Sequence, residues 1–453
     1  MPSESKIIFL ACFTIFISLF DVNYFMVSYP VIAKSLDTTL ASVTIVNIVF
    51  LMSLVIGLPI AGKINDSINP KRTMIIGFTL LIFSGFLCSL SQTLHQLAFF
   101  RAFQGLASAL LTISSTALIV IYIDIENRAK SFSYLGSAGA LGLTLGSPIG
   151  GLISGNYNWH ILFLSLIPLF FLALIANLWI LPKSDKAIEF KSFISNFDFK
   201  GAFFITLGLL LFVYSMHLFI ETHSYELKNI FTLLLSLLFI SLFIHYELKL
   251  QNPLLNLRVF QNNFFSLLLI ANLSAVVILS INNFIMPFYL THKLNLLPQE
   301  IGFVMLSFSI FYGLVGLIVA KLTKIYDLYL LCFIGIFTIF LFSIYFTFQN
   351  DSASITQVIF LLIGYGTGFA FFIPPAYSLI LNSATKENAG NITAIFQTAR
   401  QLASLMGIVS IGLLIQNSQQ VVHFHSIFLL QVLLSFISIS FLIYIYYLKK
   451  MES

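Results

Sequence analysis

The sequence predicts an all-α integral membrane protein with about 14 transmembrane helices. Of its 453 residues, 59% are hydrophobic and 9% are charged, whereas a soluble domain carries about 25% charged residues. Apolar stretches recur along the whole chain, and each is long enough to cross a hydrocarbon core of about 30 Å as a helix of roughly 20 residues. A soluble globule of this length would lack the charges needed to coat its surface, so that class is excluded.

The predicted spans cover 7–30, 41–62, 73–93, 97–123, 131–155, 161–182, 201–220, 228–247, 264–290, 300–320, 328–347, 355–382, 391–416 and 424–447. For 201–220 and 228–247 the alternative is a re-entrant hairpin. Their length and their lack of a central charge favour two full spans.

The distribution of Lys and Arg predicts the orientation in the membrane. An even number of spans places both termini on one side. With the N-terminus inside, about 17 basic residues fall in cytoplasmic segments and about three in outer ones, namely Lys34, Lys228 and Lys293. We therefore expect a multi-pass protein of the cell (inner) membrane with both termini in the cytoplasm. The net charge of +5 then reflects topology, and no nucleic-acid partner is expected.

The lengths of the connecting segments divide the chain into three parts. Residues 1–182 form a first six-helix bundle, residues 183–250 hold a cytoplasmic linker and two inserted helices, and residues 251–453 form a second six-helix bundle. An arrangement of six plus six helices is typical of two similar bundles with a pathway between them.

One polar motif follows the second predicted span. From Gly62 to Arg72 the sequence reads GKINDSINPKR. Gly62 allows close helix approach, and Asp66 can accept hydrogen bonds from the N-terminus of a neighbouring helix or from a guanidinium. We predict a conformational latch made by Gly62, Asp66, Lys71 and Arg72. The alternative is an ordinary basic cytoplasmic loop.

A second motif lies in the fourth predicted span. Arg101 and Gln104 are three residues apart and share one helix face, with Gly105 beside them. The accompanying glutamine and small residues indicate an interior, hydrated face. The alternative is an arginine that snorkels to the outer interface.

The fifth predicted span is rich in glycine. Residues 136–151 read GSAGALGLTLGSPIGG and include Gly142, Gly146, Pro148, Gly150 and Gly151. Such glycines let two helices touch through their backbones, and a proline bends a helix where bundles could pivot. The alternative is generic packing of small residues.

Two further ionisable residues fall inside predicted spans. Asp21 is the only acid well inside one, and an unpaired carboxylate there costs a few kcal/mol or more. Asp21 is thus the candidate for proton coupling, with a permanently paired structural aspartate as the alternative. Arg400, followed by Gln401, lies near the middle of the thirteenth span. It could face an anionic substrate, pair with a carboxylate or bond helix carbonyl groups.

These motifs together resemble the major facilitator superfamily, in particular its branch of 14-span drug:H⁺ antiporters. The first-span segment Leu19-Phe20-Asp21 with Pro30 also resembles that branch. The sequence departs from the family pattern at Asn69 and Pro70, where glycine and arginine are usual, and at Ser147, which separates glycine from proline. The fifth-span segment resembles the antiporter motif of the superfamily, which implies export, and the family resemblance implies alternating access. With Asp21 as the candidate for proton coupling, Arg101, Gln104, Arg400 and Gln401 are the candidates for the substrate cavity or for coupling.

We therefore expect a secondary active transporter, namely a proton-coupled exporter of drugs or metabolites. Its partners would be a small-molecule substrate, protons and the lipid bilayer, and we expect a monomer without cofactor or metal. The chain has no P-loop, zinc-binding HExxH or nucleophile-elbow sequence, so we expect no enzyme activity. A lipid or lipophile flippase, a metabolite importer or uniporter, and a membrane sensor are the alternatives. One intramembrane acid against two arginines makes a neutral, zwitterionic or anionic substrate at least as consistent with the sequence as a lipophilic cation.

Overall fold

A computed structural model describes residues 3–26, 28–38, 40–182, 198–222, 227–250, 253–296, 298–349, 353–382, 388–416 and 424–452. In these residues the regular structure is entirely helical, and fourteen of the helices contain 20 or more residues. Eleven are long and apolar enough to cross a membrane. The predicted all-α membrane fold is thus confirmed.

The N-terminal half contributes six long helices and one short one. They are α1 (Glu4–Met26), α2 (Tyr29–Ser35), α3 (Leu40–Ile68), α4 (Pro70–Ser89), α5 (Leu94–Tyr122), α6 (Ile125–Asn156) and α7 (His160–Ile180). Within this half α1 packs against α6, and α5 packs against both α3 and α4.

The C-terminal half repeats this plan, after an inserted pair formed by α9 (Phe199–Thr222) and α10 (Leu227–Glu247). A 3-10 turn, η1 (Leu257–Gln261), precedes α11 (Asn263–Leu294), α12 (Pro298–Leu322), α13 (Leu328–Phe348), α14 (Ile355–Leu381), α15 (Ala389–Gln416) and α16 (Phe424–Glu452). Here α14 packs against α12 and α13, and α11 packs against α15 and α16.

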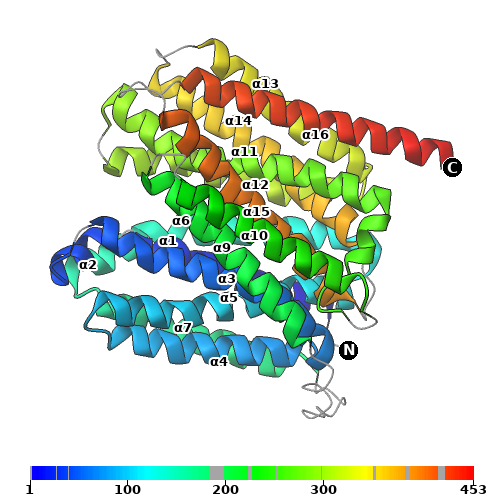
Figure 1. Ribbon diagram of the computed structural model, residues 1–453. Helices are drawn as coiled ribbons and strands as arrows, with labels where there is room; N and C mark the ends of the chain where they lie inside the picture. Colours follow the sequence, from blue (N-terminus) through cyan, green and yellow to red (C-terminus); the bar gives the residue numbers. More distant parts are fainter. Residues whose placement is uncertain are drawn as a thin grey trace.

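The two halves lie side by side, with the inserted pair in front of them (Figure 1). Helix α6 packs against α12 and α14, α3 packs against α15, and α9 touches both α3 and α15. Both chain ends lie on one side, at the right of Figure 1, as an even number of spans requires. We call this the termini side.

Several predicted helix ends were wrong by a turn or more. The first span was expected to reach residue 30, but α1 ends at Met26, and Pro30 opens α2. Proline is favoured in the first turn of a helix and disfavoured in its interior. In the other direction, α3 runs to Ile68 and α6 already begins at Ile125. Hydropathy detects only the apolar part of a helix, and these ends are polar.

Glycines bring some helices into backbone contact. A Cβ atom on Gly105 of α5 would overlap the Phe50 carbonyl oxygen of α3 and would lie 2.9 Å from Ser53 Cβ. Since association of helices in lipid depends on close packing rather than on the hydrophobic effect, such contacts fix which helices are neighbours.

We predict that Gly105→Ala destabilises the protein by about 1–3 kcal/mol, because the added methyl group overpacks the contact between α3 and α5. A thiol-reactive fluorogenic dye in detergent measures the melting temperature, since unfolding exposes the buried Cys88 and Cys332. Gly302→Ala is the matched control, because nothing lies within 4 Å of an added Cβ there. Equal melting temperatures for the two variants would contradict the packing argument.

Candidate functional site

A buried ion pair joins α1 to α5 in the N-terminal half. The Arg101 Nη1 group lies 3.1 Å from Asp21 Oδ2 and donates to Gln104 Oε1 at 2.8 Å. Arg101 is 0% exposed and Asp21 is 3% exposed. The guanidinium therefore points into the bundle and does not reach an interface, as the snorkelling alternative would require.

Aromatic rings enclose this guanidinium. The Arg101 Cζ atom lies 4.3 Å from the centre of the Phe25 ring and 4.5 Å from that of Phe50. The ring faces attract a cation electrostatically, more strongly where water is excluded. Arg101 Nε and Nη2 are buried without a hydrogen-bond partner among the described atoms. Asp21 is thus the main source of compensation for this charge.

The glycines of α6 hold α1 in place beside the pair. A Cβ atom on Gly142 would lie 2.5 Å from the Phe16 carbonyl oxygen, and one on Gly150 would overlap that of Tyr24. Gly146 is buried and Gly151 is half-buried, whereas the side chain of Pro148 lies outside the described residues. In this conformation Gly142 and Gly150 pack within the N-terminal half, as generic packing of small residues does, and a pivot at Pro148 stays a prediction.

Arg400 on α15 lies in the C-terminal half, without a carboxylate. Its Nη1 group donates to Gln397 Oε1 at 2.8 Å, and its Cζ atom lies 5.2 Å from the centre of the Tyr377 ring. No ion pair joins it to an acid in the described part of the chain. Gln401 is half-buried and is rotated by about 100° around the helix relative to Arg400.

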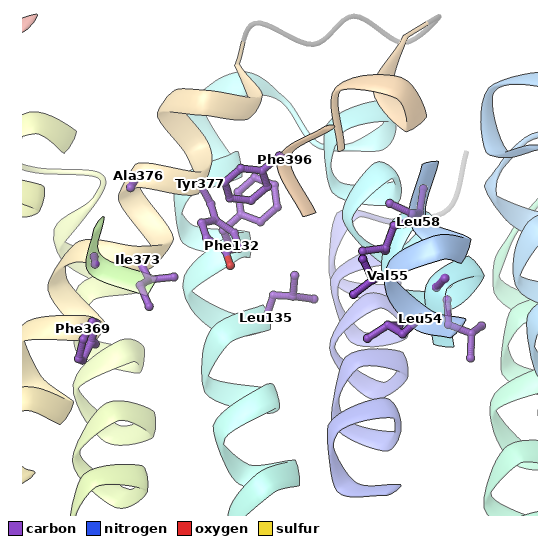
Figure 2. Packing of buried hydrophobic residues seen from close by; sticks show 14 of the residues in the cluster. Leu54, Val55, Leu58, Phe132, Leu135, Phe369, Ile373, Ala376, Tyr377 and Phe396 are labelled. Atoms are coloured by element: carbon purple, nitrogen blue, oxygen red, sulfur yellow. The ribbon is translucent and has the colours of Figure 1, made fainter. Parts of the chain in front are cut away.

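An aromatic cluster packs at this point between the two halves (Figure 2). The Tyr377 ring of α14 meets Phe132 of α6 at 6.2 Å and Phe396 of α15 at 4.6 Å between ring centres, both edge to face. The Arg400 guanidinium lies over the Tyr377 ring. Movement of the halves at this cluster would therefore change the surroundings of Arg400.

Asp66 connects the end of α3 to the start of α15. It accepts hydrogen bonds from Gly390 N at 2.6 Å and from Asn391 N at 2.8 Å. These N–H groups belong to the first turn of α15, where the helix dipole favours a negative charge. Of the two partners that the sequence allowed for Asp66, the structure has the helix N-terminus. We call Asp66 with these two N–H groups the latch.

The other latch candidates take different positions. Gly62 lies against α15, because a Cβ atom on it would lie 2.8 Å from the Gly390 carbonyl oxygen. Lys71 instead donates to the carbonyl groups of Leu178 and Leu181 at the end of α7. The Arg72 backbone N–H donates to Asn69, which caps α4. These contacts of Lys71 and of the Arg72 backbone lie within the N-terminal half, and their part in a conformational latch stays a prediction.

Three interhalf contacts were not predicted from the sequence. Arg128 is buried and donates to the Leu381 carbonyl oxygen of the opposite half, and Ser137 donates to that of Gly313 at 3.0 Å. Lys63 donates to Pro253 O at 2.9 Å. In the sequence, Lys63 and Arg128 indicated only a cytoplasmic loop. Ser137 was one of many small residues in its span, and nothing marked it as a contact residue.

The described hydrogen bonds between the halves gather toward one side. Most involve the last turns of α3 and the first turns of α6 and α15, which lie toward the termini side, whereas Ser137 and Gly313 meet in the interiors of α6 and α12. In this conformation hydrogen bonds therefore hold the two halves together on the termini side.

The comparison with known families agrees with this architecture. Residues 11–259 and 268–452 match the family described as the Major Facilitator Superfamily. The chain belongs to this superfamily. It is thus a multi-pass membrane transporter of small molecules and not an enzyme.

Relatives in the superfamily have more than one recorded substrate type. The riboflavin transporter RibZ of Clostridioides difficile is 24% identical over 409 residues, covering 90% of this chain and 87% of that protein. Multidrug resistance protein 3 of Bacillus subtilis is 25% identical over 371 residues, covering 80% and 70%. The proton:xylose symporter XylE has a TM-score of 0.67 at 14% identity over 97% of this chain and 94% of its own, which shows the shared fold.

In this superfamily member, Asp21 and Arg101 are expected to be energetically coupled. Either Asp21→Asn or Arg101→Gln alone leaves a buried charge uncompensated and should cost about 3–5 kcal/mol. The double variant removes both charges. Its loss of unfolding free energy should therefore be clearly smaller than the sum of the losses in the two single variants. Melting temperatures of all four proteins in detergent measure this. Additive losses would show that the contact carries no coupling.

Proposed function

We propose that this protein is a proton-coupled exporter that moves a small drug or metabolite across the cell membrane by alternating access. The buried pair of Asp21 and Arg101 carries the proposal. It is an ionisable carboxylate at an inner position of α1, held by a cation on another helix. We take the termini side to be cytoplasmic, in line with the distribution of Lys and Arg.

A proton at Asp21 would compete with Arg101 for the carboxylate. Protonation removes the negative charge and so takes away the one counter-charge that the described structure places beside the Arg101 guanidinium. A buried uncompensated charge is costly, so the protonated form favours a conformation in which water or another group reaches Arg101. Proton occupancy thereby becomes coupled to conformation through one contact.

The latch supplies the second conformational element. With Asp66 bound to the start of α15, the termini side is closed; opening it requires the two N–H groups and the carboxylate to find other partners. Because these contacts are few and well defined, they can form in one state and be absent in the other, as rocking of two rigid bundles requires.

Arg400 supports an anionic or zwitterionic substrate group. Arg101 already has Asp21, whereas Arg400 has only neutral partners in the described residues, namely Gln397 and Tyr377. Arg400 is half-buried, and its Nε atom is buried without a hydrogen-bond partner among the described atoms; a negative charge stabilises such a cation most. The relatives handle both riboflavin and several drugs by their names, which is compatible with a cavity that is not restricted to cations.

We predict that Asp21→Asn abolishes substrate transport driven by a pH gradient in proteoliposomes, because an amide neither binds nor releases the proton. Exchange of substrate across the membrane without a gradient should persist, since it needs only the movement of the bundles. Asp37→Asn is the matched control. Asp37 is exposed and has a φ of 47°, which asparagine also tolerates. Wild-type gradient-driven transport in the Asp21 variant would remove Asp21 from the coupling mechanism.

We also predict that Arg400→Gln raises the KM for an anionic substrate by about tenfold or more, because one charge-assisted hydrogen bond contributes about 1.5–3 kcal/mol. Arg400→Lys should recover part of this loss. The same vesicles assayed with a quaternary ammonium dye provide the comparison, and the exposed Arg258→Gln variant is the control. Transport of the dye alone, at an unchanged KM in Arg400→Gln, would show that Arg400 does not recognise substrate.

A further inference from the structure

Two acids meet at the base of the inserted helix pair, far along the chain from Asp21. Asp198 precedes α9 and Glu247 ends α10, and their carboxyl groups lie within hydrogen-bonding reach of each other. Glu247 is 2% exposed. Asp198 Oδ1 accepts from Gly201 N at 2.9 Å, and Glu247 Oε1 accepts from Leu254 N at 3.2 Å.

The remaining oxygens of the pair lack a donor. Asp198 Oδ2 and Glu247 Oε2 are both buried without a hydrogen-bond partner among the described atoms. Two carboxylates in contact cannot both stay ionised in such surroundings, because like charges repel strongly where water is absent. A single proton held between the two carboxyl groups turns this repulsion into a hydrogen bond.

No cation takes the place of that proton. The Tyr246 hydroxyl faces Asp198, and a phenol is neutral at ordinary pH. On the elements packed nearby, Lys63 donates to Pro253 O, and Asp66 is engaged by α15. The remaining charged side chains of α9 and α10 at this end are exposed, namely Lys200, His245 and Lys249, and no ion pair joins any of these groups to Asp198 or Glu247 within the described residues.

The pair is connected to the latch through the segment 253–256. Glu247 accepts from the backbone of Leu254, and the Leu254 carbonyl oxygen accepts from Asn391 Nδ2 at 3.1 Å. The Asn391 backbone N–H in turn donates to Asp66. A separation of the two carboxyl groups would therefore disturb the segment that holds Asn391 against Asp66.

We propose that Asp198 and Glu247 form a second proton-binding site, separate from Asp21, whose occupancy keeps the termini side closed. The closed conformation holds the carboxyl groups together and so binds the proton more tightly than a conformation that separates them. Stabilisation of the closed state is therefore present at low pH and is lost as pH rises.

The test measures opening of the latch directly and needs neither substrate nor a functional Asp21. Cys12, Cys88 and Cys332 are replaced by alanine, and Thr393→Cys provides a thiol on α15 that is 0% exposed in the closed state. Labelling of this thiol by a maleimide in detergent reports opening. Rates are divided by those of Ser67→Cys, an exposed position, which removes the pH dependence of the thiol chemistry itself.

We expect the normalised labelling rate to rise with pH between about pH 5.5 and 9, by up to about tenfold per pH unit for one linked proton. Glu247→Gln should give low, pH-independent labelling, because the amide both donates to Asp198 and accepts from Leu254. Asp198→Asn should give the same low, pH-independent labelling. Glu126→Gln, an exposed acid on the same side, should keep the wild-type profile.

Three results would overturn the proposal. They are a flat profile for the wild type, a wild-type slope in Glu247→Gln and Asp198→Asn, and closure by Na⁺ or K⁺ at fixed high pH, which would make the site a metal-cation site. The two proposals can fail independently. The expected labelling profile together with gradient-driven transport that survives Asp21→Asn would leave this site intact and remove the transport mechanism, and the opposite pair of results would do the reverse.

Discussion

A guanidinium enclosed by hydrocarbon and aromatic rings constrains the whole N-terminal half. Arg101 is fully buried, and Asp21 is the one carboxylate that reaches it in the described structure. For this pair to form, α1 must approach α5 at a fixed depth and rotation, and the glycines of α6 allow that position by contacting the α1 backbone. The glycine-rich helix and the ion pair are therefore two parts of one arrangement. A buried pair of this kind adds little net stability, but the loss of one partner is expensive, which suits a contact whose charge state changes.

The contacts between the halves follow a different rule. They combine an apolar cluster around Phe132, Tyr377 and Phe396 with polar contacts made by backbone groups and a helix N-terminus, such as the Asp66 contact with α15. The polar contacts are directional and few. They lose their energy over a small displacement, which would favour two distinct states of the interface in the proposed mechanism, whereas the densely packed interior of each half resists deformation. Rigid halves and a discrete interface are the physical requirements for alternating access.

The sequence was sufficient for the helices, because length and apolarity alone determine which stretches can span a membrane. Partners were harder to predict. Asp21 and Arg101 are 80 positions apart, and their contact depends on how α1 and α5 are rotated, which no local pattern encodes. Lys71 was predicted to take part in the latch because it belongs to the basic cluster that follows Asp66 in the motif. It binds the end of α7 because α4 and α7 are neighbours in space. The Asp198–Glu247 contact joins the two ends of an inserted helix pair, and each acid alone resembles an ordinary loop residue.

Asp21, Asp66 and Glu247, which are buried or half-buried, differ in the groups that compensate their charge. Asp21 has a guanidinium, Asp66 has the N-terminus of α15, and Glu247 has the backbone N–H of Leu254 and, beside it, another carboxyl group. The first two can keep their charge without a proton. The third lies against a second carboxyl group, and by our proposal it binds a proton there, independently of the transport pathway. Applied to cations, the same reasoning singles out Arg400, since Arg101 has Asp21 and Arg128 bonds three carbonyl oxygens. Arg400 has neutral partners alone in the described residues, and a negative group that enters between the halves would find its strongest available counter-charge there.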